Sequence, residues 1–457
     1  MTRGADGLLG IRSGVPGIAW PPVQRGTAAA LAALLHQLDA TQWLPQAEVE
    51  QPQLAQLRVL AEHAAKYAPH VAMRLRAAGL SPSELGSMAG LRALPVLTRR
   101  DVQKAGDDLF CTGLPPHHGP VGVTRTSGST GEPVVVRRTA VTHLVWMAMT
   151  LRDHLWHRRD ARKKMSAIRA NVSRHETSDN WGAPFNLLFE SGLFQRLPIT
   201  LSIEEQVAHL KAFEPDSLIV YPSNLAALAR TFLAAGERLE GLAHIRTIGE
   251  TLSDDVRSLT RDAFGLAVED LYSSQEIGSV ALQCPESGLY HIMAESLIVE
   301  LLNQRGAPCA AGEVGRIVIT DLHNFATPLV RYDIGDYAEA AGPCPCGRGL
   351  PALKRIIGRE RNLVLMPDGT RHWPLVGFAL FRDIAPIAQY QMIQDGRESV
   401  EVRLVAEAPL SAAQEARLTR VIQDALGHPF ALRFSYFEGS IPAGPNGKFE
   451  EFVCRVA

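Results

Sequence analysis

The order of strand and helix patterns in the middle of the chain most constrains the fold. Two units stand next to each other, at 216–236 and 245–265, and each is a short apolar run followed by a stretch with helical spacing. In the second unit, Ser253 suits a helix N-cap and Gly265 suits a C-cap. Repeated strand-then-helix order indicates a largely parallel sheet covered by helices. The pattern therefore predicts an α/β fold.

The segments on both sides of these units extend the prediction. Residues 24–90 carry alanine and leucine at three- and four-residue intervals, so we expect a helical segment packed on a larger body. The runs SLIVELLN at 296–303 and GRIVITDLHN at 315–324 have the pattern of longer strands joined by a turn. These two strands suit an antiparallel sheet or small barrel packed beside the parallel one.

A domain boundary is predicted near Gly358, where GRERNLVLMPDGTRHWP has the pattern of a strand, a turn and a second strand. Beyond it, strand patterns flank a helix pattern that opens with a capping box from Ser411 to Gln414. We therefore expect a large N-terminal domain with more than one sheet at 1–357 and a small α+β domain at 358–457.

Charge and composition narrow the class of function. The 457 residues carry a formal net charge of -2, which offers no basic surface for nucleic acid and no polybasic patch for a membrane. The sequence has no apolar run long enough to span a bilayer and no signal-peptide core at the N-terminus, so we expect a cytoplasmic protein. Six cysteines are too sparse for a disulfide scaffold. Small-molecule chemistry is the default expectation.

The stretch TSGSTGEP at 126–133 is the strongest local motif. Its glycines and hydroxyls suit a loop whose backbone N–H groups and side chains surround phosphates, which favours an enzyme that uses ATP. It is not a Walker A loop, because no Gly-Lys-Ser/Thr follows at the required spacing. The alternative for this motif alone is a surface turn rich in serine and glycine.

Five further motifs follow in order. They are GET at 249–251, YSSQE at 272–276, RYDIGD at 331–336, GR at 358–359 and PAGPNGK at 442–448. Together with the loop they resemble the adenylate-forming superfamily, whose members activate a carboxylic acid as its acyl-AMP. The resemblance is closest to the phenylacetate-CoA ligase and capsular-biosynthesis (CapK-like) branch and runs from about residue 55 to the end. The segment LRALPVLTRRDVQ, just before the loop, also resembles that branch.

The resemblance implies a role for each motif in holding ATP. The loop residues are expected to bind the phosphates, with Thr130 among the catalytic groups: Thr126, Ser127, Gly128, Ser129, Thr130 and Gly131. Glu276 matches the acidic residue that helps to hold Mg²⁺, and Lys448 matches a mobile lysine that bridges the carboxylate and the α-phosphate. The domain that carries Lys448 is accordingly expected to act as a mobile lid on an adenylation domain.

The nucleoside is expected to lie against residues from the downstream motifs, which are Gly249, Glu250, Thr251, Tyr272, Asp336 and Arg359. Tyr272 matches the aromatic residue beside adenine. Asp336 matches the carboxylate that accepts both ribose hydroxyls, a task for an acceptor-only side chain, and Arg359 matches a ribose-side arginine. Taken singly, each of these residues has a structural alternative, as a strand-end carboxylate, a core aromatic or a solvated cation. Their shared order favours the functional interpretation.

Cys284, His291, Cys344 and Cys346 form a second candidate site. Three thiolates and an imidazole are the ligand set of a closed tetrahedral zinc site, so we expect structural zinc. The alternative is free thiols in a turn-rich region, and Cys309 stands near enough in sequence to replace one ligand.

The acid pocket is the least specified part. The branch places it near 173–182, where Trp181 is a candidate, although a polar loop explains that segment as well. Tyr221, Pro222 and Ser223 begin a helix at a strand end, where ligands often bind in open α/β sheets, and are better candidates. The resemblance suggests an aromatic or heteroaromatic acid.

The second half of the reaction stays open. CoA is the first choice of acyl acceptor, but Arg361 departs from the hinge pattern of the family, and the following loop, LVLMPDGTRHWP, is about one residue longer than in CoA ligases. An amine or a carrier-protein thiol is the alternative acceptor, in natural-product or polysaccharide biosynthesis, and a non-catalytic nucleotide-binding homologue is a third interpretation. A homodimer is left open.

Overall fold

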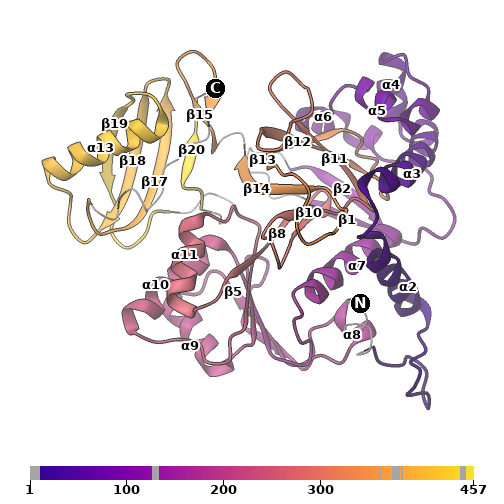
Figure 1. Cartoon of the computed structure of the whole chain (residues 1–457), viewed down its shortest axis with the longest axis horizontal. Coiled ribbons are helices and arrows are strands. Elements are labelled where there is room, and N and C mark those ends of the chain that lie inside the picture. The colour runs from indigo at the N-terminus through magenta and orange to yellow at the C-terminus, as the bar shows by residue number, and fades with distance from the viewer. Residues whose placement is uncertain are drawn as a thin grey trace.

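The computed structural model describes residues 11–125, 133–359, 362–372, 381, 384–442 and 449–456. Most of its strands join one twelve-stranded sheet with the order β11-β12-β13-β14-β10-β9-β8-β7-β6-β3-β5-β4. Figure 1 shows this sheet running through the middle of the molecule, with the N-terminal helices on one side and a separate sheet near the C-terminus on the other.

Parallel strands form one half of the large sheet, as predicted. They are β3 (Met165–Arg169), β5 (Phe194–Pro198), β6 (Ser217–Val220), β7 (His244–Ile248) and β8 (Val268–Ser274), with β4 (Glu176–Ser178) antiparallel at the edge. Helices connect them, which confirms the α/β class. At the second unit, Ser253 accepts a hydrogen bond from the backbone N–H of Val256, and Gly265 ends the helix in the left-handed conformation, as expected.

Helices cover both faces of the parallel half. On one face lie α9 (Ile203–Phe213), α10 (Pro222–Ala235) and α11 (Asp254–Phe264), which pack on Leu218, Val220 and Ile245. On the other lie α2 (Gly26–Thr41), α7 (Ala140–Trp156) and α8 (Phe185–Leu188), which pack on Met165, Ile219 and Leu271. Successive residues of one strand therefore enter different cores, as the two-residue period of a strand requires. Both faces are apolar because both are buried.

Antiparallel strands complete the sheet. They are β9 (Gly278–Gln283), β10 (Tyr290–Ile292), β14 (Ala352–Arg359), β13 (Tyr332–Ala340), β12 (Val314–Asp321) and β11 (Leu297–Leu302). The runs expected at 296–303 and 315–324 are β11 and β12, and they pair with each other. They do not form a sheet of their own, because the antiparallel pairing of β8 with β9 joins them to the parallel strands.

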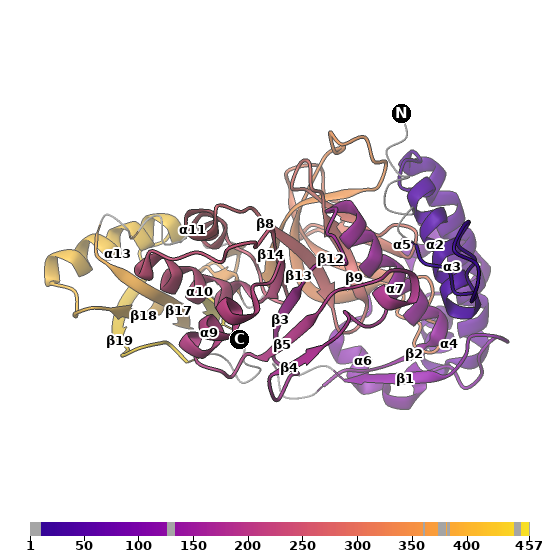
Figure 2. The ribbon, with the colours of Figure 1, turned by 90° about the horizontal axis from the view of Figure 1, so that it is seen from below.

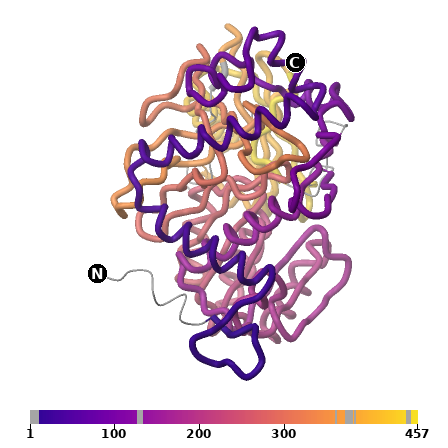
Figure 3. Tube along the Cα trace, turned by 90° about the vertical axis from the view of Figure 1, so that its right-hand side faces the viewer, coloured from indigo at the N-terminus to yellow at the C-terminus, as the bar shows by residue number. Residues whose placement is uncertain are grey.

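The N-terminal helices lie at one end of the long axis, and Figure 3 views the chain from that end. They are α3 (Gln46–Tyr67), α4 (Pro69–Ala77), η1 (Pro82–Gly86), α5 (Met88–Ala93), α6 (Arg99–Ala105) and η2 (Gly106–Leu109). Leu57 and Ala61 of α3 share a core with Ile298 and Leu322 of the antiparallel strands. The helical segment is thus packed on a larger body, as expected. The part of the chain that the structure describes contains no helix long and apolar enough to cross a membrane.

A four-stranded sheet lies at the opposite end of the long axis (Figure 2). It has the order β19-β18-β17-β20, from β17 (Ile387–Gly396), β18 (Ser399–Ala406), β19 (Ala431–Tyr436) and β20 (Phe452–Cys454), and it packs on α13 (Ala412–Leu426). The capping box between Ser411 and Gln414 is present. Two short strands, β15 (Val364–Leu365) and β16 (Arg371–His372), precede it. These elements share a core of their own, while the division into two domains at residue 358 stays a prediction.

Candidate active site

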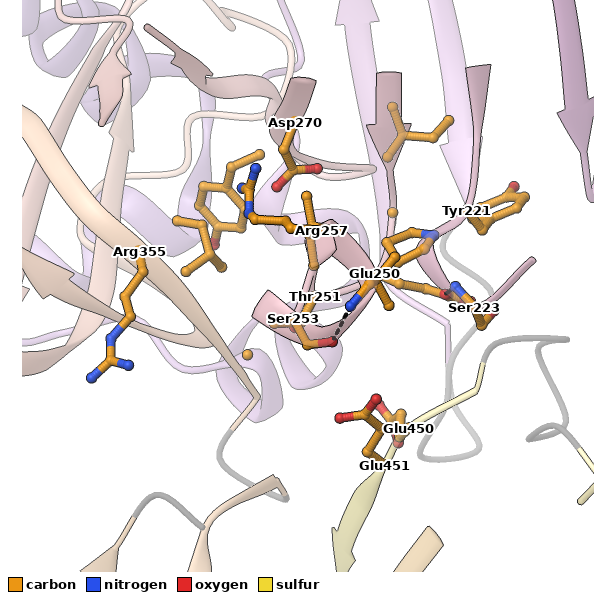
Figure 4. A pocket seen from close by; sticks show the side chains of 18 of the residues that line it. Tyr221, Ser223, Glu250, Thr251, Ser253, Arg257, Asp270, Arg355, Glu450 and Glu451 are labelled. Carbon is orange, nitrogen blue, oxygen red and sulfur yellow. Dashed lines mark hydrogen bonds between the residues drawn. The ribbon is translucent and has the colours of Figure 1, made fainter. Parts of the chain in front are cut away.

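A cavity of about 1800 Å³ opens where the parallel strands of the large sheet end. Residues that follow β6, β7 and β8 line it, together with residues of the C-terminal sheet. Figure 4 shows Tyr221, Glu250 and Ser253 on one side, with Glu450 and Glu451 approaching from the C-terminal chain. The cavity contains the predicted residues Gly249, Glu250, Thr251, Tyr272, Glu276, Asp336 and Arg359. Segments as far apart in sequence as 221 and 451 therefore meet at one site.

Tyr272, Asp336 and Arg359 form a connected group in this cavity. The Tyr272 hydroxyl donates a hydrogen bond of 2.8 Å to Asp336 Oδ2, and Arg359 Nε lies 3.4 Å from Asp336 Oδ1. Asp336 on β13 and Arg359 on β14 are direct cross-strand partners, so the pairing of these strands fixes the ion pair. Burial, and then the charge of Asp336, raise the pKa of the Tyr272 hydroxyl well above its usual value. Tyr272 is therefore a hydrogen-bond donor at neutral pH.

Glu276 occupies the turn between β8 and β9 and is buried. Its Oε1 lies 3.1 Å from Arg99 Nη1, which belongs to the first turn of α6. The turn has a second contact, since Arg138 donates a hydrogen bond to the backbone carbonyl of Gln275. The segment before the loop thus supplies a cation to the predicted magnesium residue, which the sequence motifs alone did not reveal.

Glu250 connects three parts of the cavity wall. Its Oε2 accepts a hydrogen bond of 3.0 Å from the backbone N–H of Ser223, in the first turn of α10, where an acidic group interacts favourably with the helix dipole. Its Oε1 accepts one of 3.4 Å from the backbone N–H of Phe449. Gly249 and Thr251 line the cavity beside it. The GET motif therefore contacts the chain directly after Lys448.

Two predicted elements lie outside the described residues. These are the loop residues from Thr126 to Gly131, and Lys448; the hinge residue Arg361 is also outside. The described chain fixes where each begins and ends. Arg125 of β1 (Val121–Arg125) pairs with Val135 of β2 (Val135–Thr139), so the loop joins two antiparallel strands, and Phe449 contacts the cavity wall.

The predicted acid-pocket residues divide into two groups. Tyr221, Pro222 and Ser223 line the cavity. Trp181 does not belong to the described lining, which corrects that expectation. Its ring packs against His154 and Phe185, its indole N–H donates to the carbonyl of Lys163 at 3.0 Å, and only 3 % of it is exposed. A buried tryptophan satisfied in this way serves the core.

Two arginines and a tryptophan that were not predicted also line the cavity. Arg246, Arg169 and Trp146 line it, from β7, β3 and α7 respectively. An arginine inside the apolar strand HIRTI is unusual enough to have been a signal, because arginine is rarely buried without a partner. The positions of Arg169 and Trp146 depend on strand order and helix packing, which no local pattern specifies.

Cys284, His291, Cys344 and Cys346 gather in a buried cluster. Their candidate ligand atoms all lie within 4.8 Å of one another. The sulfur atoms of Cys344 and Cys284 are 3.8 Å apart, and Cys346 Sγ is 3.3 Å from His291 Nε2. Among the described residues, this group includes no other cysteine, so Cys309 does not replace a ligand here.

The geometry of this cluster fits zinc. Sulfur ligands about 2.3 Å from a tetrahedral zinc ion would be about 3.8 Å apart, which is the separation of Cys284 and Cys344. His291 presents Nε2 to the cluster while its Nδ1 lies 3.3 Å from the carbonyl of Leu350. A ligating histidine commonly holds its second ring nitrogen in this way. The residues present would therefore accept the ion without a change of fold.

Comparisons with known proteins agree with this arrangement. No family model matches the sequence. Phenylacetate-coenzyme A ligase of Escherichia coli (strain K12) is 24 % identical over 393 residues, which cover 81 % of this chain and 85 % of that protein. Protein CapK of Staphylococcus aureus is 21 % identical over 79 % of this chain and 80 % of its own length. A solved structure of 2-hydroxyisobutyryl-CoA ligase with an acyl-AMP matches with a TM-score of 0.73, at 18 % identity and 91 % coverage of both chains.

The chain is thus similar over most of its length to phenylacetate-coenzyme A ligases and to protein CapK. The predicted resemblance to the phenylacetate-CoA ligase and CapK-like branch of the adenylate-forming superfamily agrees with these curated relatives. The structural match shows that the shared fold extends to the C-terminal sheet, because it covers nine-tenths of both chains. Residues of the GET, YSSQE, RYDIGD and GR motifs line one cavity of this fold.

Proposed function

We propose that this protein activates a carboxylic acid as its acyl-AMP and then transfers the acyl group to a thiol, with CoA as the first choice. The observation that carries the proposal is the meeting of Tyr272, Asp336 and Arg359 with Glu276 in one cavity. These residues come from separate strands and motifs, and their shared cavity is large enough for ATP and an acid together.

In the first step the acid carboxylate attacks the α-phosphorus of ATP, and pyrophosphate leaves. Asp336 would accept the ribose hydroxyls, held in position by the hydroxyl of Tyr272 and the guanidinium of Arg359. Bound Mg²⁺ would neutralise charge on the phosphates, and Glu276 would be one of its ligands. Because Arg99 already contacts Glu276, this guanidinium would stabilise the carboxylate and stand close to the phosphates.

The phosphate loop and Lys448 complete the proposed machinery. The loop from Thr126 to Gly131, including Thr130, would surround the β- and γ-phosphates. Lys448 would bridge the carboxylate and the α-phosphate, which concentrates positive charge where the transition state is most negative. The contact between Phe449 and Glu250 supports this role, since it brings the residue after Lys448 to the cavity wall. Residues 358–457 would then act as a lid on the domain formed by 1–357.

In the second step the thiol attacks the carbonyl carbon, the bond to the bridging oxygen breaks, and AMP leaves. CoA is preferred because the relatives at 24 % identity are named phenylacetate-coenzyme A ligases. The relatives also include protein CapK, whose name does not mention CoA, and an amine or a carrier-protein thiol stays the second candidate acceptor.

We also propose that the cysteine and histidine cluster holds a structural zinc ion. All four ligands are buried protein side chains, so the site would be closed and would leave no position for substrate. The ligands come from the strands and loops around β9, β10 and β14. The ion would therefore link these neighbouring strands of the large sheet.

The test is ATP-dependent pyrophosphate release with a panel of carboxylic acids, run with and without CoA and with hydroxylamine as a trap. The substitution Lys448→Ala should reduce release by about a hundredfold or more while ATP binding persists. Lys211→Ala is the matched control, because Lys211 is exposed and pairs with Glu237 away from the cavity. Unchanged release in Lys448→Ala would remove this lysine from the mechanism.

CoA separates the two candidate acceptors in the same assay. A CoA-dependent increase in the rate, with formation of a thioester, would identify a CoA ligase. Hydroxamate formation that is indifferent to CoA would identify an amine or carrier-protein acceptor. If none of the acids in the panel supports pyrophosphate release, the proposed activity is contradicted.

A further inference from the structure

We propose that the acid substrate carries a second anionic group, of the carboxylate kind, at the end far from the reacting carboxyl, and that Arg246 and Arg169 recognise it. This inference rests on the proposed function and concerns the acid end of the same cavity. It specifies the class of substrate as a dicarboxylic acid with a planar body.

Strand register places the two arginines on one wall. In β7, Arg246 and Ile248 are two residues apart and therefore point to the same face of the sheet, and both line the cavity. Tyr221 follows the end of β6, and its hydroxyl accepts a hydrogen bond of 3.3 Å from the backbone N–H of Ala170, the residue after Arg169. Arg169 therefore lies at the strand ends, while Arg246 lies one layer deeper.

Arg246 is a buried cation with an unused donor. The residue is 9 % exposed, and its Nη1 donates to Asp153 Oδ2 at 2.7 Å and lies 3.2 Å from His154 Nε2. Among the described residues, no acceptor contacts its buried Nε. A buried N–H without a partner costs free energy, and more so on a charged group. Because Arg246 also lines the cavity, a small turn of its side chain would present this donor to an acceptor on a ligand.

The local charge balance favours an anion. Asp153 is shared between Arg246 and Arg159, each at 2.7 Å, and Glu269 contacts Arg159 and also His157 and His244. The two carboxylates thus balance the two buried guanidinium groups. Arg169 is an additional cation, and within the described chain it forms no ion pair and no side-chain hydrogen bond, while its charge acts to lower the pKa of Arg246. A neutral hydrocarbon tail would leave this excess charge unopposed.

The body of the substrate would lie against an aromatic wall. Trp146 of α7 lines the cavity, is 38 % exposed and stacks on His143 with ring centroids 5.3 Å apart. A β-carbon at Gly278, two residues after Glu276, would lie 3.5 Å from the Trp146 ring. The Trp146 ring therefore lies close to the turn that carries Glu276. A planar group of the substrate that packs on this ring would extend away from Glu276. Such packing favours aromatic rings.

The experiment compares matched aromatic acids that differ only by a second carboxylate, such as phenylacetate and 4-carboxyphenylacetate. The readouts are kcat/KM for pyrophosphate release and the thermal stabilisation of the full-length protein by each acid. We expect the dicarboxylate to be preferred by about tenfold to a hundredfold, as charge-assisted hydrogen bonds in a buried site provide.

Two variants and a control assign the preference. Arg169→Met should lower the ratio of the two kcat/KM values about tenfold, and Arg246→Lys should do the same, because a lysine that pairs with Asp153 has no second donor in the place of Nε. Since Arg246 supports a buried network, its variant is checked by circular dichroism; Arg169 is partly exposed and keeps the test valid if that variant unfolds. Arg162→Met, at an exposed pair with Asp160, should leave the ratio unchanged.

The outcomes separate this inference from the proposed function. A wild-type ratio near one, or a ratio that neither variant changes, would overturn the inference while acid activation stands. If no acid supports pyrophosphate release, the proposed function fails, and the binding data decide the inference. Stabilisation by the dicarboxylate alone that is lost in Arg169→Met would then support it, and equal or absent stabilisation would overturn it.

Discussion

The hydroxyl of Tyr272 donates a 2.8 Å hydrogen bond to Asp336, although 64 positions separate the two residues. Because burial and the nearby carboxylate raise the pKa of Tyr272 well above its usual value, the donor keeps its proton throughout the physiological range. One oxygen of Asp336 is therefore occupied by the tyrosine, and the carboxylate has a fixed orientation toward the cavity.

Replacing Asp336 tests the proposed ribose site. Asp336→Asn should raise the KM for ATP by about tenfold to a hundredfold, because one of the two acceptor oxygens becomes a donor. The change is measured by ATP–pyrophosphate exchange. Asp333→Asn, on the same strand and paired with Arg316 at 3.3 Å, is the matched control. Equal KM values for Asp336→Asn and the wild type would place ribose elsewhere.

Magnesium dependence tests Glu276. The variant Glu276→Gln retains an acceptor for Arg99, so the fold should persist, whereas the loss of charge should raise the Mg²⁺ concentration needed for half-maximal pyrophosphate release by about tenfold. Glu286→Gln is the control, because Glu286 is half-exposed and lies 4.0 Å from Arg348. A titration in which Glu276→Gln follows the wild-type curve would exclude Glu276 as a ligand.

Metal analysis tests the cysteine and histidine cluster. The purified protein should contain one zinc ion per chain by inductively coupled plasma mass spectrometry. The variant Cys346→Ser should lose the ion and should have a melting temperature lower by roughly 5 °C. Cys309→Ser should keep the ion, since Cys309 lies outside the cluster. If the purified wild-type protein contains no zinc, and the two variants have equal melting temperatures, the structural zinc site is ruled out.

Stability against pH tests the environment of Glu451 beside the cavity. Burial raises the pKa of its carboxyl to about 7, and the charges of Asp255 and Glu250 add to the effect, while a hydrogen bond from Tyr390 opposes it. The folded state therefore binds the proton more tightly than the unfolded state, in which the pKa is about 4.5. Stability from this group is complete below about pH 4.5 and is lost as the pH rises through about 7.

The expected loss is about 1 kcal/mol between pH 5 and pH 8, a value reduced for the partial exposure of the carboxyl. Glu451→Gln should flatten this part of the profile in denaturant unfolding and should be more stable than the wild type at pH 8. Glu407→Gln, exposed in the same part of the chain, should not. A Glu451→Gln profile parallel to that of the wild type would show that this carboxyl does not titrate in the window.

Much of the fold could be predicted because local rules decide it. The strand-then-helix units, the caps at Ser253 and Gly265 and the capping box at Ser411 each depend on residues within a few positions. The pairing of β8 with β9 depends instead on the whole sheet, and it was not predicted. It joins the parallel and antiparallel strands into one sheet.

The site divides in the same way. Tyr272, Glu276 and Asp336 could be predicted to lie in one site because each stands in a motif with a chemical reason for its residue types, and all three line the cavity. Their roles stay predictions. Arg246 was not predicted to line the cavity, since its position there depends on a contact with Asp153 of α7, which lies 93 positions away in the sequence. Trp181 was assigned to the acid pocket because the composition of the segment 173–182 suits a pocket. Its packing against Phe185 is set by tertiary structure, which that segment alone does not specify.

The most direct measurement follows an isotope. An acid that supports pyrophosphate release is labelled with ¹⁸O in its carboxylate, converted with ATP and the acceptor, and the AMP product is analysed by mass spectrometry. If the carboxylate attacks the α-phosphorus and the acyl-AMP is then cleaved at the carbonyl carbon, one ¹⁸O atom appears in AMP and none in pyrophosphate. Label in inorganic phosphate with ADP as the product, or no transfer of label to AMP, would contradict an acyl-AMP intermediate.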